Sequence, residues 1–370
     1  MTKKILFTIG VVAAVAIGVF VYLNKTDKTT ETVKIGAVLP LTGNLAFLGE
    51  TGKNGLTLAE NYINTNHLLN NGQQVKFVLS DGAGVPKTSI NALNHLLDAE
   101  QVKMVFSIVS SVDVSFIPIQ KDRNFLFVSH ATHPALSGVG PLFFRHSPTV
   151  EQEANLLKQH IGNDAPSIVL LNMSDDYGVA FAKIATQEEF ILPANIFTFN
   201  PTEQDFRTIC TRAIQSNPNK VVICGNGKDL YRIVIALRQL GYKNEIIATL
   251  GFKVGGAFEQ VKDSAIFTYV DFKKPVIDSK YSGVLKEYYN QYHKEMNVNE
   301  MIFFNSALLL VEAINRSTDK NDVSEIAKKL SDMGPFSGLG ENMAISAMHD
   351  ILPELEILTN NNDNATRNNQ

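Results

Sequence analysis

The sequence is poor in cysteine, and neither of its two cysteines, Cys210 and Cys224, follows the N-terminal apolar segment. A lipid anchor on an N-terminal cysteine of the mature chain is therefore excluded. The pair is compatible with a disulfide in an oxidising compartment. It is equally compatible with two small buried side chains, one on a helix and one on a strand. The spacing does not decide between these alternatives, because it does not give the distance between the two Cα atoms.

Runs of basic residues are absent outside the N-terminus, and 33 basic and 37 acidic side chains give a formal net charge of −4. A nucleic-acid-binding protein would carry a basic patch, so we expect no nucleic-acid partner. Beyond residues 5–23, no apolar stretch is long enough to cross a bilayer. With 45% hydrophobic and 19% charged residues over 370 positions, the chain has the composition of about two globular domains.

Motifs of catalysis, nucleotide binding and metal binding are also missing. The chain has neither a His-Glu-x-x-His nor a Gly-x-Ser-x-Gly sequence. Gly225-Asn-Gly227 follows a strand-like run, but Leu230 stands where a dinucleotide loop has its third glycine. His130 and His133 are three residues apart in a loop, without an evident set of further zinc ligands. We therefore expect no enzyme, no cofactor and no metal.

The N-terminal residues 1–24 have the pattern of a signal peptide or a membrane anchor. Two lysines precede Ile5–Leu23, a long stretch without a charge. Ala14-Val-Ala16 is a possible cleavage site, but cleavage there would leave an apolar tail on the mature chain. Cleaved apolar cores usually run about 7–15 residues, so the length favours an uncleaved anchor. The polar residues 25–32 would form a linker, with the soluble bulk outside the cytoplasm and tethered to the inner membrane.

From Val33 the chain alternates between short apolar runs of strand type and amphipathic helical segments. This order builds parallel sheets with helices on both faces. The alternation is interrupted near His146-Ser-Pro148 and then restarts, which indicates two similar lobes. Residues 360–370 are rich in asparagine and have almost nothing to bury, so we expect a disordered tail.

The first strand–loop–helix unit places a loop where α/β proteins bind ligands. Val33–Leu39 has the pattern of a strand, Pro40–Gly49 that of a loop, and Asn54–Asn64 carries apolar residues at helical spacing. In open α/β sheets, ligands bind outside the carboxyl ends of the strands. The loop at Pro40–Gly49 is therefore a candidate wall of a binding site.

Two further strand ends carry hydroxyl side chains. Ser110 and Ser111 follow a strand-like run and precede a helix, where hydroxyls and free helix N–H groups form an anion site. The simpler interpretation is an ordinary N-cap, which needs only one hydroxyl. Ser129–Thr132 ends the next strand in the same way. Because adjacent units of this kind converge on one crevice, we expect a small-molecule site there.

Taken together, these segments resemble the type 1 periplasmic binding proteins, in particular the leucine/isoleucine/valine-binding branch that serves ABC importers. The resemblance extends from about residue 33 to about residue 358. Each segment is weak alone, and the resemblance rests on their order and spacing. The segments are Ile35–Gly43, Asn54–Asn64, Val109–Ser111, Val128–Thr132, Asp176–Gly178 and Asp205–Arg207.

The resemblance implies two doubly wound parallel-sheet lobes joined by three crossovers, near Ser147-Pro148, Asp271–Pro275 and Gly334-Pro335. Lobe 1 would comprise residues 33–147 and 275–334, and lobe 2 residues 148–274 and 335–359. It also implies that the lobes close over a small carboxylate- or amide-type, amino-acid-like ligand. The partner would be an ABC permease, or a membrane sensor.

The resemblance further implies which residues contact the ligand. The candidates are Leu48, Ser110, Ser111, Ala131, Thr132, Tyr177, Asn226 and Phe252. Ser110 and Thr132 would bind the ligand carboxylate, with a backbone N–H near Ala131. Tyr177 would close from lobe 2, and Leu48 would cover the ligand at a position that is often aromatic.

One departure from the family concerns the ligand amine. Amino-acid binders hold the ligand ammonium with an acidic residue in lobe 2, but the corresponding segment Leu250–Val254 has no acid. A buried ammonium without a counter-charge is costly. Asp175 or Asp271 would have to replace the missing acid, or Lys253 would favour a second anionic group on the ligand.

Two other functions are compatible with parts of the sequence. A sensor or structural interaction module would keep the fold and use the N-terminal anchor, and neighbouring permease, ATPase or kinase genes would distinguish these roles. An α/β hydrolase would need a nucleophile with a base in reach, and the sequence supports no Ser–His or Cys–His arrangement.

Overall fold

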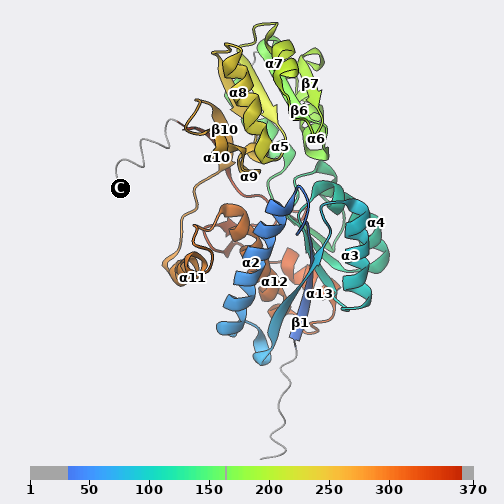
Figure 1. Ribbon diagram of the computed structural model, residues 1–370. Coiled ribbons are helices and arrows are strands. Elements are labelled where there is room, and N and C mark those ends of the chain that lie inside the picture. Colours follow the sequence, from blue (N-terminus) through green and yellow to red (C-terminus); the bar gives the residue numbers. More distant parts are fainter. Residues whose placement is uncertain (1–31, 163–164, 361–370) are drawn as a thin grey trace, which may run out of the picture.

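The computed structural model describes residues 32–162 and 165–360 (Figure 1). The predicted anchor at 5–23, most of the linker and the tail after residue 360 lie outside the described residues. Two lobes stand one above the other in Figure 1, each built on its own six-stranded sheet with helices on both faces. The predicted α/β class with two parallel-sheet lobes is confirmed.

Lobe 1 is a doubly wound parallel sheet with the strand order β13-β5-β4-β3-β1-β2. Its strands are β1 (Thr32–Leu39), β2 (Gln74–Asp81), β3 (Met104–Ser107), β4 (Leu126–Ser129), β5 (Phe143–His146) and β13 (Asp350–Ile351). Its helices are α2 (Ala46–Thr65), α3 (Pro86–Asp98), α4 (Ser110–Arg123), α11 (Ser282–Tyr292), α12 (Val298–Arg316) and α13 (Val323–Ser331). The residues of β3, β4 and β5 are buried throughout, as expected for strands covered on both faces.

Lobe 2 repeats this plan with the strand order β14-β10-β9-β8-β6-β7. Its strands are β6 (Ile168–Met173), β7 (Ile196–Phe199), β8 (Lys220–Cys224), β9 (Glu245–Ala248), β10 (Thr268–Phe272) and β14 (Leu355–Thr359). Its helices are α5 (Val150–Ile161), α6 (Asp176–Gln187), α7 (Arg207–Ile214), α8 (Tyr231–Gln239), α9 (Leu250–Val254) and α10 (Ala257–Val261). All pairings are parallel except β10 with β14.

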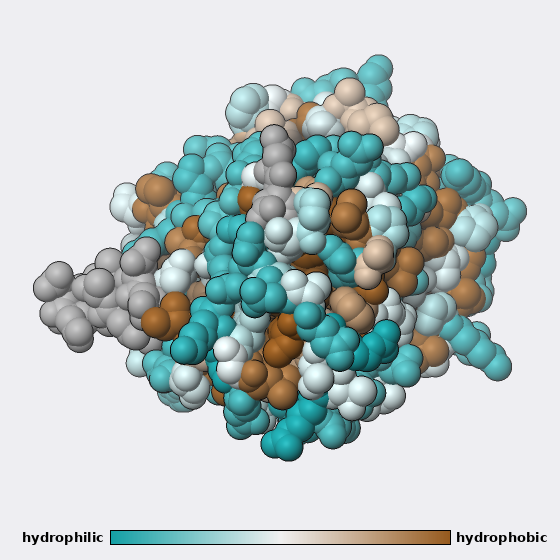
Figure 2. All heavy atoms as spheres, turned by 90° about the horizontal axis from the view of Figure 1, so that it is seen from above, coloured by the Kyte–Doolittle hydropathy of each residue, from teal (hydrophilic) through white to brown (hydrophobic). Residues whose placement is uncertain are grey.

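The long helix α12 belongs to the core of lobe 1. Contrary to the sequence expectation, this second stretch is long and apolar enough to cross a membrane, but 78% of its most apolar window is buried inside the protein. It packs along α2, and a capping box between Asn297 and Glu300 begins it. Burial in the core therefore accounts for its apolar character. Seen from above (Figure 2), the surface is largely hydrophilic, and its apolar side chains form small separate groups.

The third crossover differs from the prediction at Gly334-Pro335. Strand β13 pairs in parallel with β5, and the buried Arg145 forms an ion pair with Asp350, Nε to Oδ1 2.9 Å. Residues 335–351 therefore belong with lobe 1, and the chain enters lobe 2 at 352–354, just before β14. The sequence prediction was wrong here because a two-residue strand shows no alternation pattern.

Helix α2 begins at Ala46 and not at the predicted Asn54. Gly49 and Gly52 suggested a loop, but they are packing positions inside the helix. A Cβ atom at Gly49 would lie 2.1 Å from the carbonyl oxygen of Pro40, and one at Gly52 would meet the Leu39 side chain. The absence of side chains lets the helix approach the end of β1 closely.

The two cysteines are small buried side chains and do not form a disulfide. Cys210 lies on α7 and Cys224 on β8, and both are buried free thiols. Burial raises the pKa of both thiols, that of Cys210 to about 12. They therefore act as small apolar core residues.

Candidate ligand-binding crevice

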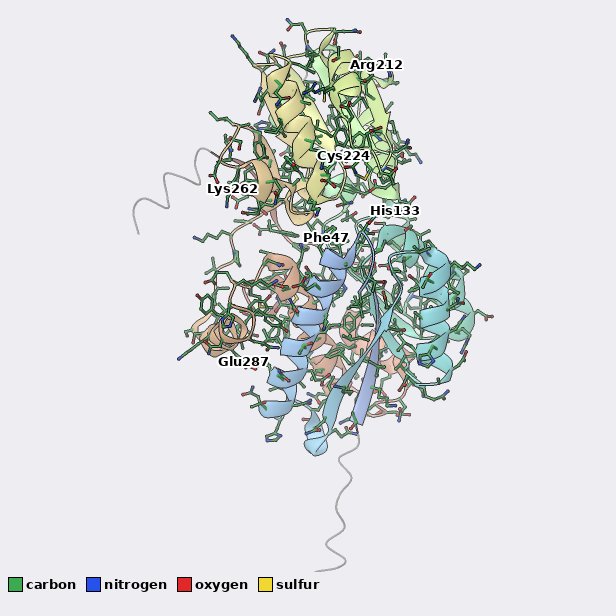
Figure 3. The ribbon with its side chains drawn as sticks, in the orientation of Figure 1. Phe47, His133, Arg212, Cys224, Lys262 and Glu287 are labelled. Atoms are coloured by element: carbon green, nitrogen blue, oxygen red, sulfur yellow. The ribbon has the colours of Figure 1, made fainter. Side chains whose placement is uncertain are left out.

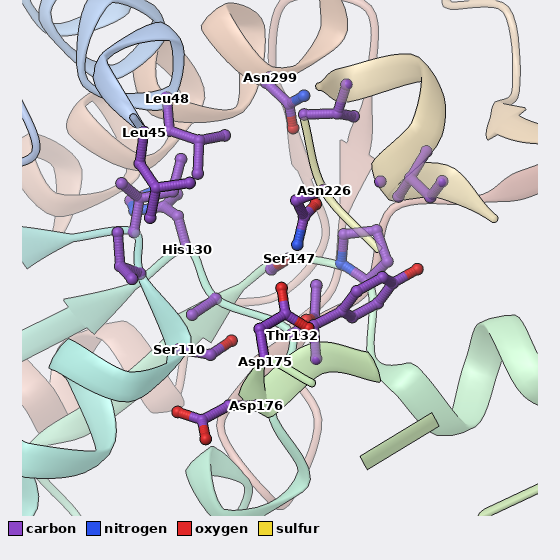
Figure 4. A pocket seen from close by; sticks show the side chains of 18 of the residues that line it. Leu45, Leu48, Ser110, His130, Thr132, Ser147, Asp175, Asp176, Asn226 and Asn299 are labelled. Atoms are coloured by element: carbon purple, nitrogen blue, oxygen red, sulfur yellow. The ribbon is translucent and has the colours of Figure 1, made fainter. Parts of the chain in front are cut away.

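A cavity of about 170 Å³ lies between the two lobes, at the carboxyl ends of the parallel strands (Figure 4). Lobe 1 contributes the start of α2, the segments after β3 and β4, and the first crossover. Lobe 2 contributes the segments after β6, β8 and β9. In Figure 3, Phe47 and His133 mark the edge of lobe 1 that faces lobe 2, and Arg212 lies at the far end of lobe 2.

Seven of the eight predicted ligand-binding residues line this cavity. They are Leu48, Ser110, Ser111, Ala131, Thr132, Tyr177 and Asn226. The structure also adds lining residues that the sequence reasoning did not select. These include Leu45, His130, Pro148, Leu250, Val254, Phe272 and Asn299. Leu45 had a usable signal, since it precedes Leu48 by three residues at the beginning of a helix.

Phe252 is not part of the site, contrary to the prediction. Its side chain is fully buried in the core of lobe 2, where its ring lies 5.5 Å from that of Phe267 between centroids. The short helix α9 turns Phe252 inwards, while Leu250, Gly251 and Val254 of the same helix line the cavity. The resemblance located the segment correctly, but only the helical phase decides which of its residues faces the ligand.

The wall of lobe 1 is an array of hydrogen-bond donors. Helix α4 begins at Ser110, and its N-cap residue Val109 makes no side-chain capping bond. The simpler N-cap interpretation of the two serines is therefore wrong. Ser110 and Ser111, the first two residues of α4, line the cavity and bring the positive end of the helix dipole to it. This arrangement favours an anionic group such as a carboxylate.

Ala131 lines the cavity, but its N–H is already engaged. It donates to Ser129 Oγ at 3.2 Å, and the Ser129 hydroxyl donates to Asp113 Oδ2 at 2.5 Å. The backbone N–H expected near Ala131 to assist the ligand carboxylate is therefore not that of Ala131 itself, and its place stays a prediction. Asp113 instead holds the end of β4 from behind the wall, because it lies on α4 itself.

Asp175 supplies a carboxylate from lobe 2. It caps α6 by accepting from the Gly178 N–H at 2.8 Å, and the Asn226 side chain lines the cavity with it. Burial raises the pKa of Asp175, while the bond from the Gly178 N–H and the Asn226 side chain lower it. In Figure 4, Asp175 and Asn226 lie between the lobe 1 residues and the rest of lobe 2. A carboxylate in this place can accept hydrogen bonds from an ammonium group.

The other candidates for a charged contact lie elsewhere. Lys253 forms an ion pair with Asp271, and its Nζ lies 4.8 Å from the ring centroid of Phe258. Neither Lys253 nor Asp271 lines the cavity. In the part of the chain that the structure describes, the cavity lining contains two aspartates and no lysine or arginine.

Tyr177 lines the cavity with its ring, while its hydroxyl is turned away into lobe 2. The hydroxyl donates to Glu153 Oε2 at 2.5 Å, and the residue is 6% exposed. The side chain is thus fixed from behind. His130, also at the cavity, is held between Ser107 O and Ser306 Oγ and stacks on Phe303.

The sequence profile described as periplasmic binding protein matches residues 32–351 of this chain. A Leu/Ile/Val-binding protein homolog 3 of Brucella melitensis is 25% identical over 233 residues, which is 61% of this chain and 60% of the relative. The Leu/Ile/Val-binding protein BraC3 of Rhizobium johnstonii is 27% identical over 200 residues, 52% of this chain and 54% of the relative. The chain thus aligns with 60% or less of the length of these relatives.

Solved structures share the fold over nearly the whole chain. LivJ of Streptococcus pneumoniae in complex with isoleucine has a TM-score of 0.76 at 19% identity, covering 89% of this chain and 96% of LivJ. A solute-binding protein of R. palustris in complex with benzoate has a TM-score of 0.74 at 15% identity, covering 88% and 92%. At such identities the likeness establishes the fold alone.

The profile match extends over both lobes, and the two-sheet architecture agrees with it. The chain therefore belongs to the periplasmic binding protein family.

Proposed function

We propose that this protein captures a small α-amino acid by closure of its two lobes and delivers it to an ABC-type importer. The observation that carries the proposal is that Asp175 of lobe 2 lines the same cavity as the N-terminus of α4 in lobe 1. One wall favours a carboxylate and the other an ammonium. A zwitterion bound between them would satisfy both ends of the site.

The rest of the lining supports an apolar ligand side chain. Leu45 and Leu48 of lobe 1 lie at the cavity together with Leu250, Val254 and Phe272 of lobe 2. A volume of about 170 Å³ is below the range of about 300–1,000 Å³ typical of drug-sized ligands. The site thus suits one amino acid better than a peptide.

Closure would be a hinge motion at the three crossovers, because they join two separately packed cores. The closed form is what a permease would recognise. Delivery to a permease and the N-terminal tether at residues 5–23 are part of this proposal. The tether itself lies outside the described residues.

A thermal-shift screen of amino acids, amides and organic acids tests the proposal. An amino acid present at 100 times its dissociation constant should add about 2.7 kcal/mol to the stability of the protein. Ser110→Ala combined with Thr132→Ala should abolish this stabilisation, since both hydroxyls at the carboxylate wall are lost. Thr202→Ala with Ser324→Ala, at two exposed positions, is the matched control. Unchanged ligand-dependent melting in the Ser110/Thr132 variant would refute the site.

A further inference from the structure

A buried carboxylate lies behind the lobe 2 wall. Glu153, on α5, is 2% exposed. Its Oε1 accepts from the Leu250 N–H at 2.5 Å, and its Oε2 accepts from the Tyr177 hydroxyl at 2.5 Å. Leu250 and Tyr177 both line the cavity, but they belong to different elements, α9 and α6. One side chain therefore ties together two separate parts of the ligand-binding wall.

This arrangement suits the ionised carboxylate and not the neutral acid. Both groups that face Glu153 are donors, and across residues 32–162 and 165–360 no lysine, arginine or histidine forms an ion pair with it. A neutral acid carries a proton on one oxygen, and that oxygen would then meet a second donor. The Tyr177 bond would have to break or reverse, and both bonds would lose the strength that the charged acceptor gives them. Burial opposes the charge and raises the pKa of Glu153 to about 7, although both hydrogen bonds lower it.

The surrounding groups do not titrate at neutral pH. Burial raises the pKa of Tyr177 and of Cys224 on β8 well above their ordinary values, so both keep their protons. Thr249, which precedes α9, contributes a fully buried hydroxyl without a hydrogen-bond partner in the described chain. A second acid, Asp175 at the cavity, lies near this cluster. The negative charges of Glu153 and Asp175 both contribute to the raised pKa of the Cys224 thiol.

We propose that Glu153 is a positioning residue of the ligand site. Its carboxylate holds the Tyr177 ring and the Leu250 backbone in the binding geometry, and protonation of Glu153 loosens both and weakens ligand capture. The predicted change in ligand affinity rests on the proposed function. The predicted loosening of Tyr177 and Leu250 does not depend on it. Because the ionised form binds best, affinity should fall as the pH is lowered through about 7.

The first experiment measures the affinity for L-leucine and L-isoleucine by calorimetry between pH 6 and pH 8.5. The wild type should bind about tenfold more weakly at the acidic end. Glu153→Gln should bind about tenfold more weakly at pH 8 and show no such fall, since a lost bond to a charged group is worth about this factor. A fall caused by Asp175 would persist in Glu153→Gln, which would overturn the proposal. Glu188→Gln, exposed in the same lobe, is the matched control.

A double-mutant cycle tests whether Glu153 acts through Tyr177. Tyr177→Phe keeps the ring at the cavity but removes the hydroxyl that Glu153 holds. If the two residues act together, the loss of affinity in the double variant is smaller than the product of the two single losses. If the loss of affinity in the double variant equals the product of the two single losses, Glu153 does not act through Tyr177.

The second experiment needs no ligand. Hydrogen exchange of a peptide containing Leu250 is compared with that of β8, after correction for the intrinsic rate at each pH. In the wild type, the Leu250 amide should lose protection between pH 8 and pH 6 while β8 does not, and in Glu153→Gln it should be weakly protected throughout. Constant protection in the wild type would refute the role of Glu153. If the wild type binds neither amino acid nor any other in the screen, the proposed function fails, and this experiment still decides the role of Glu153.

Discussion

Asp113 is the counterpart, in lobe 1, of the carboxylate behind the lobe 2 wall. It is fully buried on α4 and accepts from the Ser129 hydroxyl, which in turn accepts from the Ala131 N–H. Burial raises the pKa of Asp113 to about 7, although the hydrogen bond from the Ser129 hydroxyl lowers it. Its protonation is therefore coupled to folding.

The sign of this coupling follows from the raised pKa. Between about pH 4 and pH 7 the folded chain keeps a proton on Asp113 that the unfolded chain has released. As the pH rises through this range, the free energy of unfolding of the wild type should therefore decrease relative to that of Asp113→Asn. The expected decrease is about 1–4 kcal/mol, at about 1.4 kcal/mol per pKa unit. Urea unfolding at pH 5 and pH 8 measures the difference. Asp122→Asn, exposed on the same helix, should change nothing, and a pH-independent difference for Asp113→Asn would contradict the argument.

Among single residues, the sequence indicated which hydroxyl side chains lie at the cavity, but not which charged side chains do. Ser110 and Thr132 could be predicted because polar residues follow strands in a regular pattern. Asp175, Asp271 and Lys253 could not be ranked from sequence. Their roles depend on which of them pair with each other, and the Lys253–Asp271 ion pair forms between α9 and β10. Only the fold brings those two elements together.

At the scale of elements, a chain of buried side chains joins α12 to the first crossover. His130 Nδ1 faces the Ser107 carbonyl at 3.2 Å and must donate to it. Burial lowers the pKa of His130 well below its usual value, so the ring is neutral and its Nε2 accepts from Ser306 Oγ at 2.9 Å. Ser306 Oγ also bonds His146 Nδ1 at 2.8 Å, and His146 Nε2 bonds Glu341 at 3.0 Å.

Ser306→Ala should therefore destabilise lobe 1. The change leaves a buried nitrogen on each of the two histidine rings without its partner. An unsatisfied buried polar group costs about 1–3 kcal/mol, so we expect a loss of at least this size in urea unfolding at pH 7. Ser324→Ala, at an exposed position on α13, should stay within about 0.5 kcal/mol of the wild type. A Ser306→Ala protein as stable as that control would show that the chain of bonds contributes nothing.

The element order was predictable, but two boundaries were not. Repeated strand–helix alternation fixes a parallel sheet, and the interruption near His146 marks the change of lobe. The start of α2 was misplaced because glycines that allow close packing resemble glycines of a loop. The third crossover was misplaced because β13 is held by Arg145 and Asp350, which are far apart in the sequence.

At the scale of the whole molecule, two lobes of the same plan present opposite chemistry to one cavity. Lobe 1 offers hydroxyls and the N-terminus of α4, and lobe 2 offers Asp175. A ligand with one positive and one negative end therefore gains from closure, because both ends are paired only when both lobes contact it. The central claim is that the ligand is such a zwitterion.

The most direct test compares three ligands by calorimetry at pH 8: the tightest-binding amino acid of the screen, its analogue without the amine, and its amide. We expect each analogue to bind the wild type at least about tenfold more weakly, since each lacks one charge-assisted interaction. In Asp175→Asn the amino acid should lose affinity while its analogue without the amine does not, so the difference between them narrows. A zwitterionic ligand held by Asp175 is ruled out if the analogue without the amine binds the wild type as tightly as the amino acid, or if Asp175→Asn leaves the amino-acid affinity unchanged.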